Sequence, residues 1–343
     1  MTGSFVWDDA GRTVVFQVDG VADAVRLLGD HGFAQFELLS TSRALAAAPG
    51  LAAAAASVHE VASGQVPDLA AGLLGEVAAG SIVALGGGRV IDTAKALAAV
   101  SGARVAALPT TMSGAEMTAI HRLPAGAESQ VSAMVRPALV IADPEEMTSQ
   151  PEAQLRASSM NALAHGADSL YTPFANPVSE MTALRGASLI AGSLDQARGD
   201  RDRASLALGS LLCGYAIDSA KFGLHHVISQ TLVRVCGTPH AETNAAILPL
   251  AAAFLAPRAP RQFVALADAL QTDPDQLEPR IRALGGSPAG LGAMGADRTQ
   301  LDQAIDTMLR RPELTFVPGP SPTKEDLAEL LDQAWSRPRE SLG

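Results

Sequence analysis

The sequence predicts an N-terminal α/β domain followed by an all-helical domain. Up to about residue 145, short apolar runs alternate with segments of helical periodicity, whereas beyond residue 147 Ala- and Leu-rich helical segments follow one another without a strand pattern. Apolar residues make up 48% of the chain and charged residues 18%, which is typical of a globular protein. A chain of 343 residues can bury two substantial cores.

The N-terminal part carries the strand signals. Runs rich in Val, Leu, Ile and Ala, bounded by Gly, Ser or Pro, predict strands at residues 12–18, 35–40, 81–88, 103–111 and 138–144. Apolar residues recur at helical spacing in residues 21–32 and 90–102. Strands that alternate with helices are typical of βαβ units, so we expect a largely parallel sheet.

The C-terminal part is predicted to be helical throughout. We expect domains at residues 1–147 and 148–343, with the boundary between residues 144 and 150. A Pro-rich connector over residues 309–326 leads into a last predicted helix at residues 326–335.

Charge and composition restrict the class of protein. A net charge of −11 argues against a nucleic-acid binder and favours small-molecule partners. No uninterrupted run of 18 apolar residues predicts a membrane span, and the first residues show no secretory signal, so a cytoplasmic protein is expected. Cys213 and Cys236 lie in apolar surroundings without metal-type spacing, which predicts buried free thiols.

Three glycines join a predicted strand to a predicted helix. Gly86, Gly87 and Gly88 allow close approach to the backbone, and a helix beginning near Arg89 or Val90 would direct its free N–H groups to the same place. The pattern predicts pyrophosphate binding; the alternative is a tight turn without a ligand.

A hydroxyl-rich loop follows the next predicted strand. Thr110, Thr111 and Ser113 would lie at the carboxyl edge of the sheet, where ligands of open α/β folds bind. Such residues also cap helices, so the loop alone is weak evidence for a ligand.

Four polar side chains in the helical part form a candidate metal site. Asn161 and His165, four residues apart, project from one helix face, and His226 and His240 follow in a later segment. Three imidazoles can share one divalent cation, with the Asn161 amide as a neutral, weaker fourth ligand. For each histidine alone, a hydrogen-bonded structural role is the alternative.

Four segments together resemble the iron-containing alcohol dehydrogenase superfamily. They read GGGRVIDTAKALA, ALPTTMSGAEMT, MNALAHGADSLYTPFANPVSE and GLHHVISQTLVRVCGTPHAETNAAILP. The maleylacetate reductase branch is most similar, because it shares MNAxAH, GLHH and PHAET. The resemblance runs from about residue 5 to the QAW segment at residues 333–335, and it implies a dehydroquinate synthase-like N-terminal domain.

The resemblance also implies a chemistry. It implies an NAD(P)H-dependent reductase, a homodimer, that acts on a small oxo-acid, enoate or carbonyl substrate between its domains. The implied cofactor-binding residues are Gly86, Gly87, Gly88, Asp92, Thr110, Thr111, Ser113 and Thr41. Asn161, His165, His226 and His240 take the positions of ligands to iron or zinc; without metal, the histidines would orient and protonate the substrate.

One departure from the family concerns proton transfer. Gln230 occupies the place of the second histidine of the family's H-x-x-x-H, a candidate proton donor. An amide can hydrogen-bond a carbonyl but cannot transfer a proton at neutral pH. Proton transfer would then pass to His226, His225 or a bound water.

Other departures concern the nucleotide. Asp19 precedes Gly20 where the family has a GxG turn, and Arg89 follows the three glycines. A non-redox cyclase, lyase or isomerase on the same fold is therefore the alternative function, and a non-catalytic scaffold is a third. Thr41, with Ser42 and Arg43 beside it, would not repel a 2′-phosphate, so NADPH or both nucleotides are expected to bind.

Overall fold

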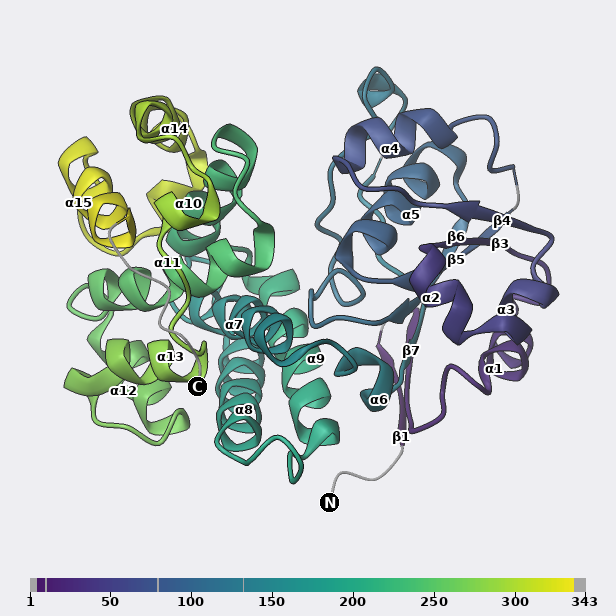
Figure 1. The fold of residues 1–343 in the computed structure, drawn as a ribbon, viewed down its shortest axis with the longest axis horizontal. Coiled ribbons are helices and arrows are strands. Elements are labelled where there is room, and N and C mark those ends of the chain that lie inside the picture. Colours follow the sequence, from purple (N-terminus) through teal and green to yellow (C-terminus); the bar gives the residue numbers. More distant parts are fainter. Residues whose placement is uncertain (1–4, 10, 79, 132, 336–343) are drawn as a thin grey trace. The chain divides into compact units, whose positions relative to one another are not determined.

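The computed structural model describes residues 5–9, 11–78, 80–131 and 133–335. The chain divides into two compact units, Met1–Gln150 and Pro151–Gly343. Each unit is described by itself below (Figure 1).

A seven-stranded sheet forms the centre of the N-terminal unit. Its strands are β1 (Phe5–Asp9), β2 (Arg12–Phe16), β3 (Glu37–Ser40), β4 (Ser57–Glu60), β5 (Ser81–Gly86), β6 (Arg104–Pro109) and β7 (Leu139–Ala142). They lie in the order β1-β2-β7-β6-β5-β3-β4. Only the β1–β2 pair is antiparallel, and all other neighbours are parallel. The five predicted strands and the largely parallel sheet are confirmed, whereas β1 and β4 were not predicted.

Helices cover both faces of this sheet (Figure 1). They are α1 (Ala24–Asp30), α2 (Ser42–Ala47), α3 (Pro49–Ala54), α4 (Val66–Leu73), α5 (Gly88–Ser101) and α6 (Pro144–Met147), with a 3₁₀ turn at Glu128–Gln130. Leu28 of α1 and Leu51 of α3 contribute to one core, and Ala70 of α4 and Ile91 of α5 to the other. Because both faces are covered, β3 and β7 are buried along their whole length.

The C-terminal unit contains only helices within the described residues. They are α7 (Glu152–Ser169), α8 (Pro177–Leu194), α9 (Arg203–Ala220), α10 (Leu224–Val235), α11 (His240–Leu255), α12 (Pro260–Ala269), α13 (Leu277–Leu284), α14 (Leu301–Met308) and α15 (Lys324–Trp335). Short 3₁₀ turns lie at Pro274–Gln276, Leu291–Met294, Arg298–Gln300 and Pro312–Phe316. The predicted all-helical character and the last helix are confirmed.

Small residues allow α7, α8 and α9 to pack closely. A Cβ atom added to Gly186 of α8 would lie 2.6 Å from the Cys213 sulfur and 2.8 Å from the Gly209 carbonyl oxygen, both on α9. A Cβ added to Gly166 of α7 would lie 3.1 Å from the same sulfur. Both cysteines are free and buried, as predicted.

In the part of the chain that the structure describes, none of the helices is both long and apolar enough to cross a lipid bilayer.

Candidate active site

One face of α7 carries a line of buried polar side chains. Asn161, His165 and Asp168 follow one another at spacings of four and three residues, so they project from the same face of the helix. All three are buried, and buried polar groups are costly unless they are hydrogen-bonded or bind a ligand.

Asp168 connects α7 to the beginning of α10. Its carboxylate accepts hydrogen bonds from the Tyr171 hydroxyl (2.6 Å), the Gly223 N–H (2.9 Å), the His226 N–H (3.3 Å) and the His226 ring at Nδ1 (2.8 Å). Burial by itself would raise the pKa of Asp168, but the hydrogen bond and charge of His226 outweigh burial and lower it to about 2. Asp168 is therefore ionised, and it both caps α10 and holds the His226 ring.

His226 has one ring nitrogen committed and one available. Because the Asp168 carboxylate can only accept, the Nδ1 of His226 carries the proton of their shared hydrogen bond. Among the described residues, none pairs with the buried Nε2. The ring stacks on that of His165, with 4.9 Å between centroids and an interplanar angle of 11°. A carboxylate behind an imidazole stabilises the protonated ring, so His226 is equipped to exchange a proton through Nε2.

His225 and His165 are equipped differently. The Nε2 of His225 lies 2.8 Å from the Asn244 amide oxygen, and the Asn244 NH₂ group donates to the His240 carbonyl oxygen, which fixes the amide orientation. Burial, followed by the charge of His226, lowers the pKa of His225 to about 3. The same two causes lower the pKa of His165 well below its ordinary value. Both rings are neutral at pH 7, so neither is a proton donor there.

His240 and Gln230 lie at the exposed side of this group. His240 is the first residue of α11 and is exposed, yet its charge contributes to the lowered pKa of both His165 and His225. Gln230 follows His226 by one turn of α10 and is half-buried. The predicted residues of the C-terminal unit therefore form one neighbourhood, which we call the histidine cluster: Asn161, His165, His225, His226 and His240.

The histidine cluster does not fit a metal centre well. Over the described ranges, no group of three or more His, Cys, Asp or Glu side chains is placed to hold a metal ion. The iron or zinc site predicted from the sequence stays a prediction, and no step below depends on it.

The glycine turn of the N-terminal unit is tightly packed. Gly87 caps α5, and Gly88 is its first residue, one position before the predicted start. A Cβ on Gly88 would lie 2.9 Å from the Ser113 Cβ, and one on Gly87 would lie 3.0 Å from the Thr111 Cγ2. Thus the predicted turn and the predicted hydroxyl loop lie against each other, with the N-terminal N–H groups of a 14-residue helix beside them. The backbone of this turn is free of side chains beside the N–H groups at the start of α5, so a phosphate group fits there.

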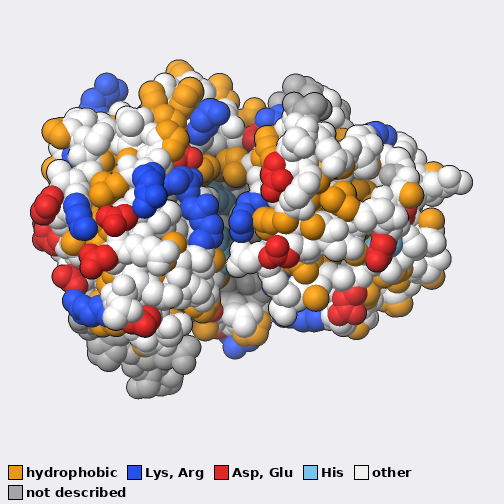
Figure 2. Space-filling model, turned by 90° about the horizontal axis from the view of Figure 1, so that it is seen from above, with side chains coloured by type: hydrophobic (Ala, Val, Ile, Leu, Met, Phe, Trp, Pro, Cys, Tyr) orange, Lys and Arg blue, Asp and Glu red, His pale blue; other side chains and the backbone are white. Residues whose placement is uncertain are grey.

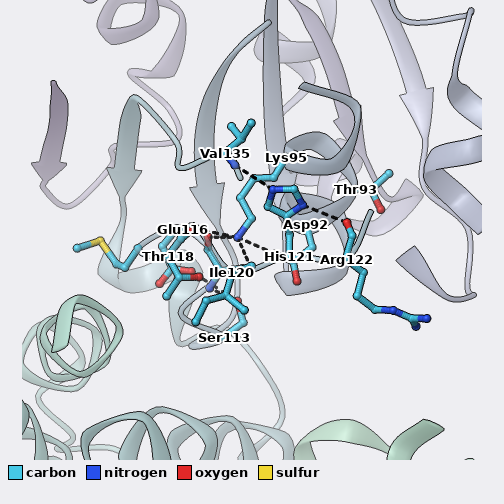
Figure 3. A network of polar contacts seen from close by, with 12 residues as sticks. Asp92, Thr93, Lys95, Ser113, Glu116, Thr118, Ile120, His121, Arg122 and Val135 are labelled. Carbon is cyan, nitrogen blue, oxygen red and sulfur yellow. Dashed lines mark hydrogen bonds and ion pairs between the residues drawn. The ribbon is translucent and has the colours of Figure 1, made fainter. Parts of the chain in front are cut away.

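A buried polar network lies beneath the hydroxyl loop (Figure 3). Lys95, fully buried, donates to the carbonyl oxygens of Ala115 (2.9 Å), Thr118 (3.0 Å) and Ile120 (2.9 Å) and pairs with Asp92 at 2.8 Å. These bonds fix the shape of the loop that carries Ser113. Asp92 is therefore the partner of a structural lysine as well as a predicted cofactor contact.

Glu116 belongs to the same network. Its carboxyl accepts from the Ser113 hydroxyl at 3.5 Å, and its other oxygen has no hydrogen-bond partner in the described chain. Burial raises the pKa of Glu116 to about 7. The side chain is thus partly protonated at neutral pH.

The remaining predicted nucleotide contacts have structural roles. The Thr41 hydroxyl caps α2 by accepting from the Ala44 N–H at 3.3 Å, and the Thr110 carbonyl accepts from the Gln150 amide at 3.2 Å. Asp19 lies in a left-handed turn (φ 59°) and is exposed, and Arg89 is exposed on α5.

Sequence analysis did not identify three polar residues of these sites, namely Asp168, Asn244 and Glu116. Asp168 lies three residues beyond His165 and Asn244 four beyond His240, so helical spacing could have placed both on the histidine faces. No comparable signal marks Glu116, because its burial depends on the packing of a loop.

Comparison with known proteins identifies the family. A model of the iron-containing alcohol dehydrogenase family matches residues 16–144, and a model of the C-terminal part of the same family matches residues 156–335. The chain belongs to the iron-containing alcohol dehydrogenase family, and it is an oxidoreductase.

Maleylacetate reductases are among the similar proteins. The chain is similar to maleylacetate reductase 1 of Rhodococcus opacus, with 34% identity over 74% of this chain and 73% of that protein. It resembles the crystal structures of an iron-containing alcohol dehydrogenase from Corynebacterium glutamicum (28% identity, TM-score 0.84, 98% of both chains) and of maleylacetate reductase from Rhizobium sp. strain MTP-10005 (27%, TM-score 0.82, 98% of this chain and 100% of that one). The resemblance to this branch inferred from the sequence is confirmed.

Proposed function

We propose that the chain is an NAD(P)H-dependent reductase of a small oxo-acid, enoate or carbonyl compound. The observation that carries the proposal is the His226–Asp168 pair, an imidazole with an ionised carboxylate on one nitrogen and an uncommitted second nitrogen. The relatives named maleylacetate reductase support a reduction over the non-redox alternative.

The glycine turn is proposed to hold the nucleotide. Gly86, Gly87 and Gly88 would accept the pyrophosphate against the N-terminal N–H groups of α5, with Thr111 and Ser113 beside it. Asp92 and Thr41 complete the proposed contacts. When bound, NAD(P)H would supply a hydride to the substrate.

His226 is proposed to supply the matching proton. Reduction of a carbonyl requires a hydride at carbon and a proton at oxygen, and His226 would donate that proton from Nε2. Asp168 stabilises the ring while it is protonated and retains the Nδ1 proton afterwards. His165 and His240 would orient the substrate, while His225, neutral and held by Asn244, would support the position of His226.

Nucleotide binding and turnover test the proposal separately. Calorimetry should detect binding of NADH, NADPH or both, weakened about tenfold or more in Gly88→Ala and unchanged in Gly80→Ala, because a Cβ at Gly80 meets nothing within 4 Å. Absence of binding by either nucleotide would refute the proposed cofactor.

Turnover tests the histidines. With a panel of oxo-acids and enones, His226→Gln should lower kcat by roughly 10²-fold or more, and His225→Gln should have a much smaller effect. Equal losses in both variants would contradict the assignment of the proton donor. Light scattering would show whether the protein is a homodimer, which is also part of this proposal.

A further inference from the structure

Gln230 follows His226 by one turn on α10. The two residues are four apart on α10, so their side chains lie on one face of the helix. Gln230 is half-buried, whereas His226 is buried. Gln230 is therefore more accessible to a ligand from solvent than His226 is.

Arg311 fixes the orientation of this amide. The guanidinium is held by Glu313, which accepts from Nε at 2.9 Å and from Nη2 at 3.0 Å. The same Nη2 donates a long hydrogen bond of 3.5 Å to the Gln230 amide oxygen. A guanidinium has donors only, so the oxygen of Gln230 must face it and the NH₂ group must face away. No acceptor for that NH₂ group exists among the described residues.

The surroundings of the amide are positively charged. Arg234 donates through Nε to the backbone carbonyl oxygen of Gln230 at 3.2 Å. Burial by itself would raise the pKa of Glu313, but the hydrogen bond from Arg311, assisted by the charges of Arg311 and Arg234, lowers it. Arg311 lies 5.6 Å from the centre of the Phe222 ring, which lies 6.0 Å from the His226 ring. Two arginines thus surround one carboxylate. Lys and Arg side chains gather more widely on the face of this unit seen in Figure 2.

We propose that Gln230 is a specificity-determining residue that donates its NH₂ group to a carboxylate oxygen of the substrate, and that Arg311 is the positioning residue that turns the amide for this purpose. The proposal rests on the proposed reductase function and narrows its substrates to carbonyl compounds that also carry a carboxylate. An acceptor-only group such as a carboxylate matches the unused donors and the surrounding positive charge.

An amide in this position has a different consequence from a histidine. A neutral histidine has one N–H, whose place depends on the tautomer, and its charge changes near neutral pH, whereas the NH₂ group of Gln230 donates at every pH at which the protein is folded. Recognition of the carboxylate is therefore separated from proton transfer, which remains with His226.

Binding of succinate, measured by calorimetry without nucleotide, tests the subsite directly. Succinate should bind the wild type, and Gln230→Glu should weaken it roughly 10- to 100-fold, because a carboxylate replaces the donor while Arg311 can still pair with it. Neutral succinamide should bind weakly to both proteins. Arg310→Met is the matched control, since Arg310 is the neighbouring residue, is exposed, and among the described residues donates only to the Asp306 carbonyl oxygen. It should retain wild-type affinity.

A double-mutant cycle tests whether Arg311 acts through Gln230. Arg311→Met and Gln230→Leu should each raise the dissociation constant for succinate, and the double variant should be hardly weaker than the worse single variant. Additive losses would show that Arg311 acts on the ligand independently and would overturn its positioning role. Circular dichroism establishes that each variant is folded.

The outcomes separate this proposal from the proposed function. Equal succinate affinity in the wild type, Gln230→Glu and Gln230→Leu, or no succinate binding by the wild type, overturns the subsite whatever the turnover. If the Gln230 variants lose succinate binding and the wild type retains it, the subsite is supported. If the wild type also oxidises neither NADH nor NADPH with any substrate of the panel, the proposed reductase function is refuted while the subsite stands. With an active enzyme, Gln230→Leu should raise KM for a keto-carboxylate much more than it lowers kcat.

Discussion

Two adjacent histidines at the beginning of α10 differ in chemistry because of their neighbours alone. His226 faces the ionised Asp168, whereas His225 faces the neutral amide of Asn244. The ionised carboxylate can stabilise a protonated ring, whereas burial and the charge of His226 together outweigh the hydrogen bond to Asn244 and keep the His225 ring neutral. Residue type gives no hint of this difference; the partner decides it.

Replacement of Asp168 tests the pair. Asp168→Asn should lower kcat/KM by about 10²- to 10⁴-fold, because an amide can donate to Nδ1 and thereby stabilise the wrong tautomer of His226. The matched control is Asp195→Asn, since Asp195 is likewise in an ion pair, with Arg280, but lies at the end of α8. A kcat/KM of Asp168→Asn within tenfold of the wild type would contradict the role of Asp168.

Asp168 should also influence acid stability. Its folded-state pKa of about 2 lies below the ordinary value of 3.8, so the stabilising contribution of the ionised carboxylate is complete above pH 4 and is lost as the pH falls towards 2. The difference corresponds to about 2 kcal/mol. Acid unfolding of the wild type should show this loss, and Asp168→Asn, which has no carboxylate to protonate there, should lack it.

Glu116 has the opposite pH dependence. Burial raises its pKa from 4.5 to about 7, so the folded protein binds more protons than the unfolded chain between these values. The contribution of protonated Glu116 to the free energy of unfolding should therefore be fully present below pH 4.5. It should be lost as the pH rises through 7, and the loss should be on the order of 3 kcal/mol.

Thermal unfolding of Glu116→Gln between pH 4.5 and 8 measures this effect. The variant should lose less stability than the wild type as the pH rises, because its side chain cannot ionise. Glu128→Gln is the control in the same unit, since Glu128 is exposed. Parallel pH profiles for Glu116→Gln and the wild type would show that Glu116 is not held protonated by its surroundings.

At the scale of elements, the close packing of α8 on α9 depends on glycine. Gly186→Ala should lower the free energy of unfolding by roughly 2–3 kcal/mol, because its Cβ would meet a backbone oxygen at 2.8 Å as well as the Cys213 sulfur. Gly192→Ala on the same helix meets nothing within 4 Å and should be neutral or slightly stabilising. Urea denaturation compares the two variants; an equally small effect in both would contradict the close contact.

Elements with strong periodicity could be predicted, and short ones could not. β5, β6 and β7 are continuous apolar runs, and α5 is long and begins at a glycine turn, so each was found. β4 has only four residues, alternates between half-buried and exposed positions, and its Val58 is exposed. It is an edge strand, and its identity depends on pairing with β3 rather than on its own pattern.

At the scale of the whole molecule, the order of the motifs identified the family, but spacing could not assign chemistry. The sequence placed Asn161, His165, His226 and His240 in one group as candidate metal ligands. It could not show that Asp168 takes one nitrogen of His226, that His240 is exposed, or that Arg311, 81 residues further on, meets Gln230. These facts depend on how distant helices pack.

Removal of metal tests whether the histidine cluster acts without a metal ion. Prolonged dialysis against a chelator should leave the turnover of the native enzyme within about twofold, since proton transfer is assigned to His226 alone. Elemental analysis before and after dialysis verifies that metal was removed. A loss of activity that added iron or zinc restores would show that the histidine cluster is a metal centre after all.

The glycine contact of α7, α8 and α9 has a consequence for divergence within this family. The helix that carries His165 and Asp168 packs on α8 and α9, and these two helices meet at positions where no side chain larger than hydrogen fits, such as Gly186 and Gly209. Variants substituted at these glycines would misfold and be lost, whereas variants substituted at positions such as Gln230 would fold and differ only in the ligand that they recognise. In a mutational library selected for folding alone, these glycines should therefore outlast the histidines, and the scaffold would persist while its substrates change.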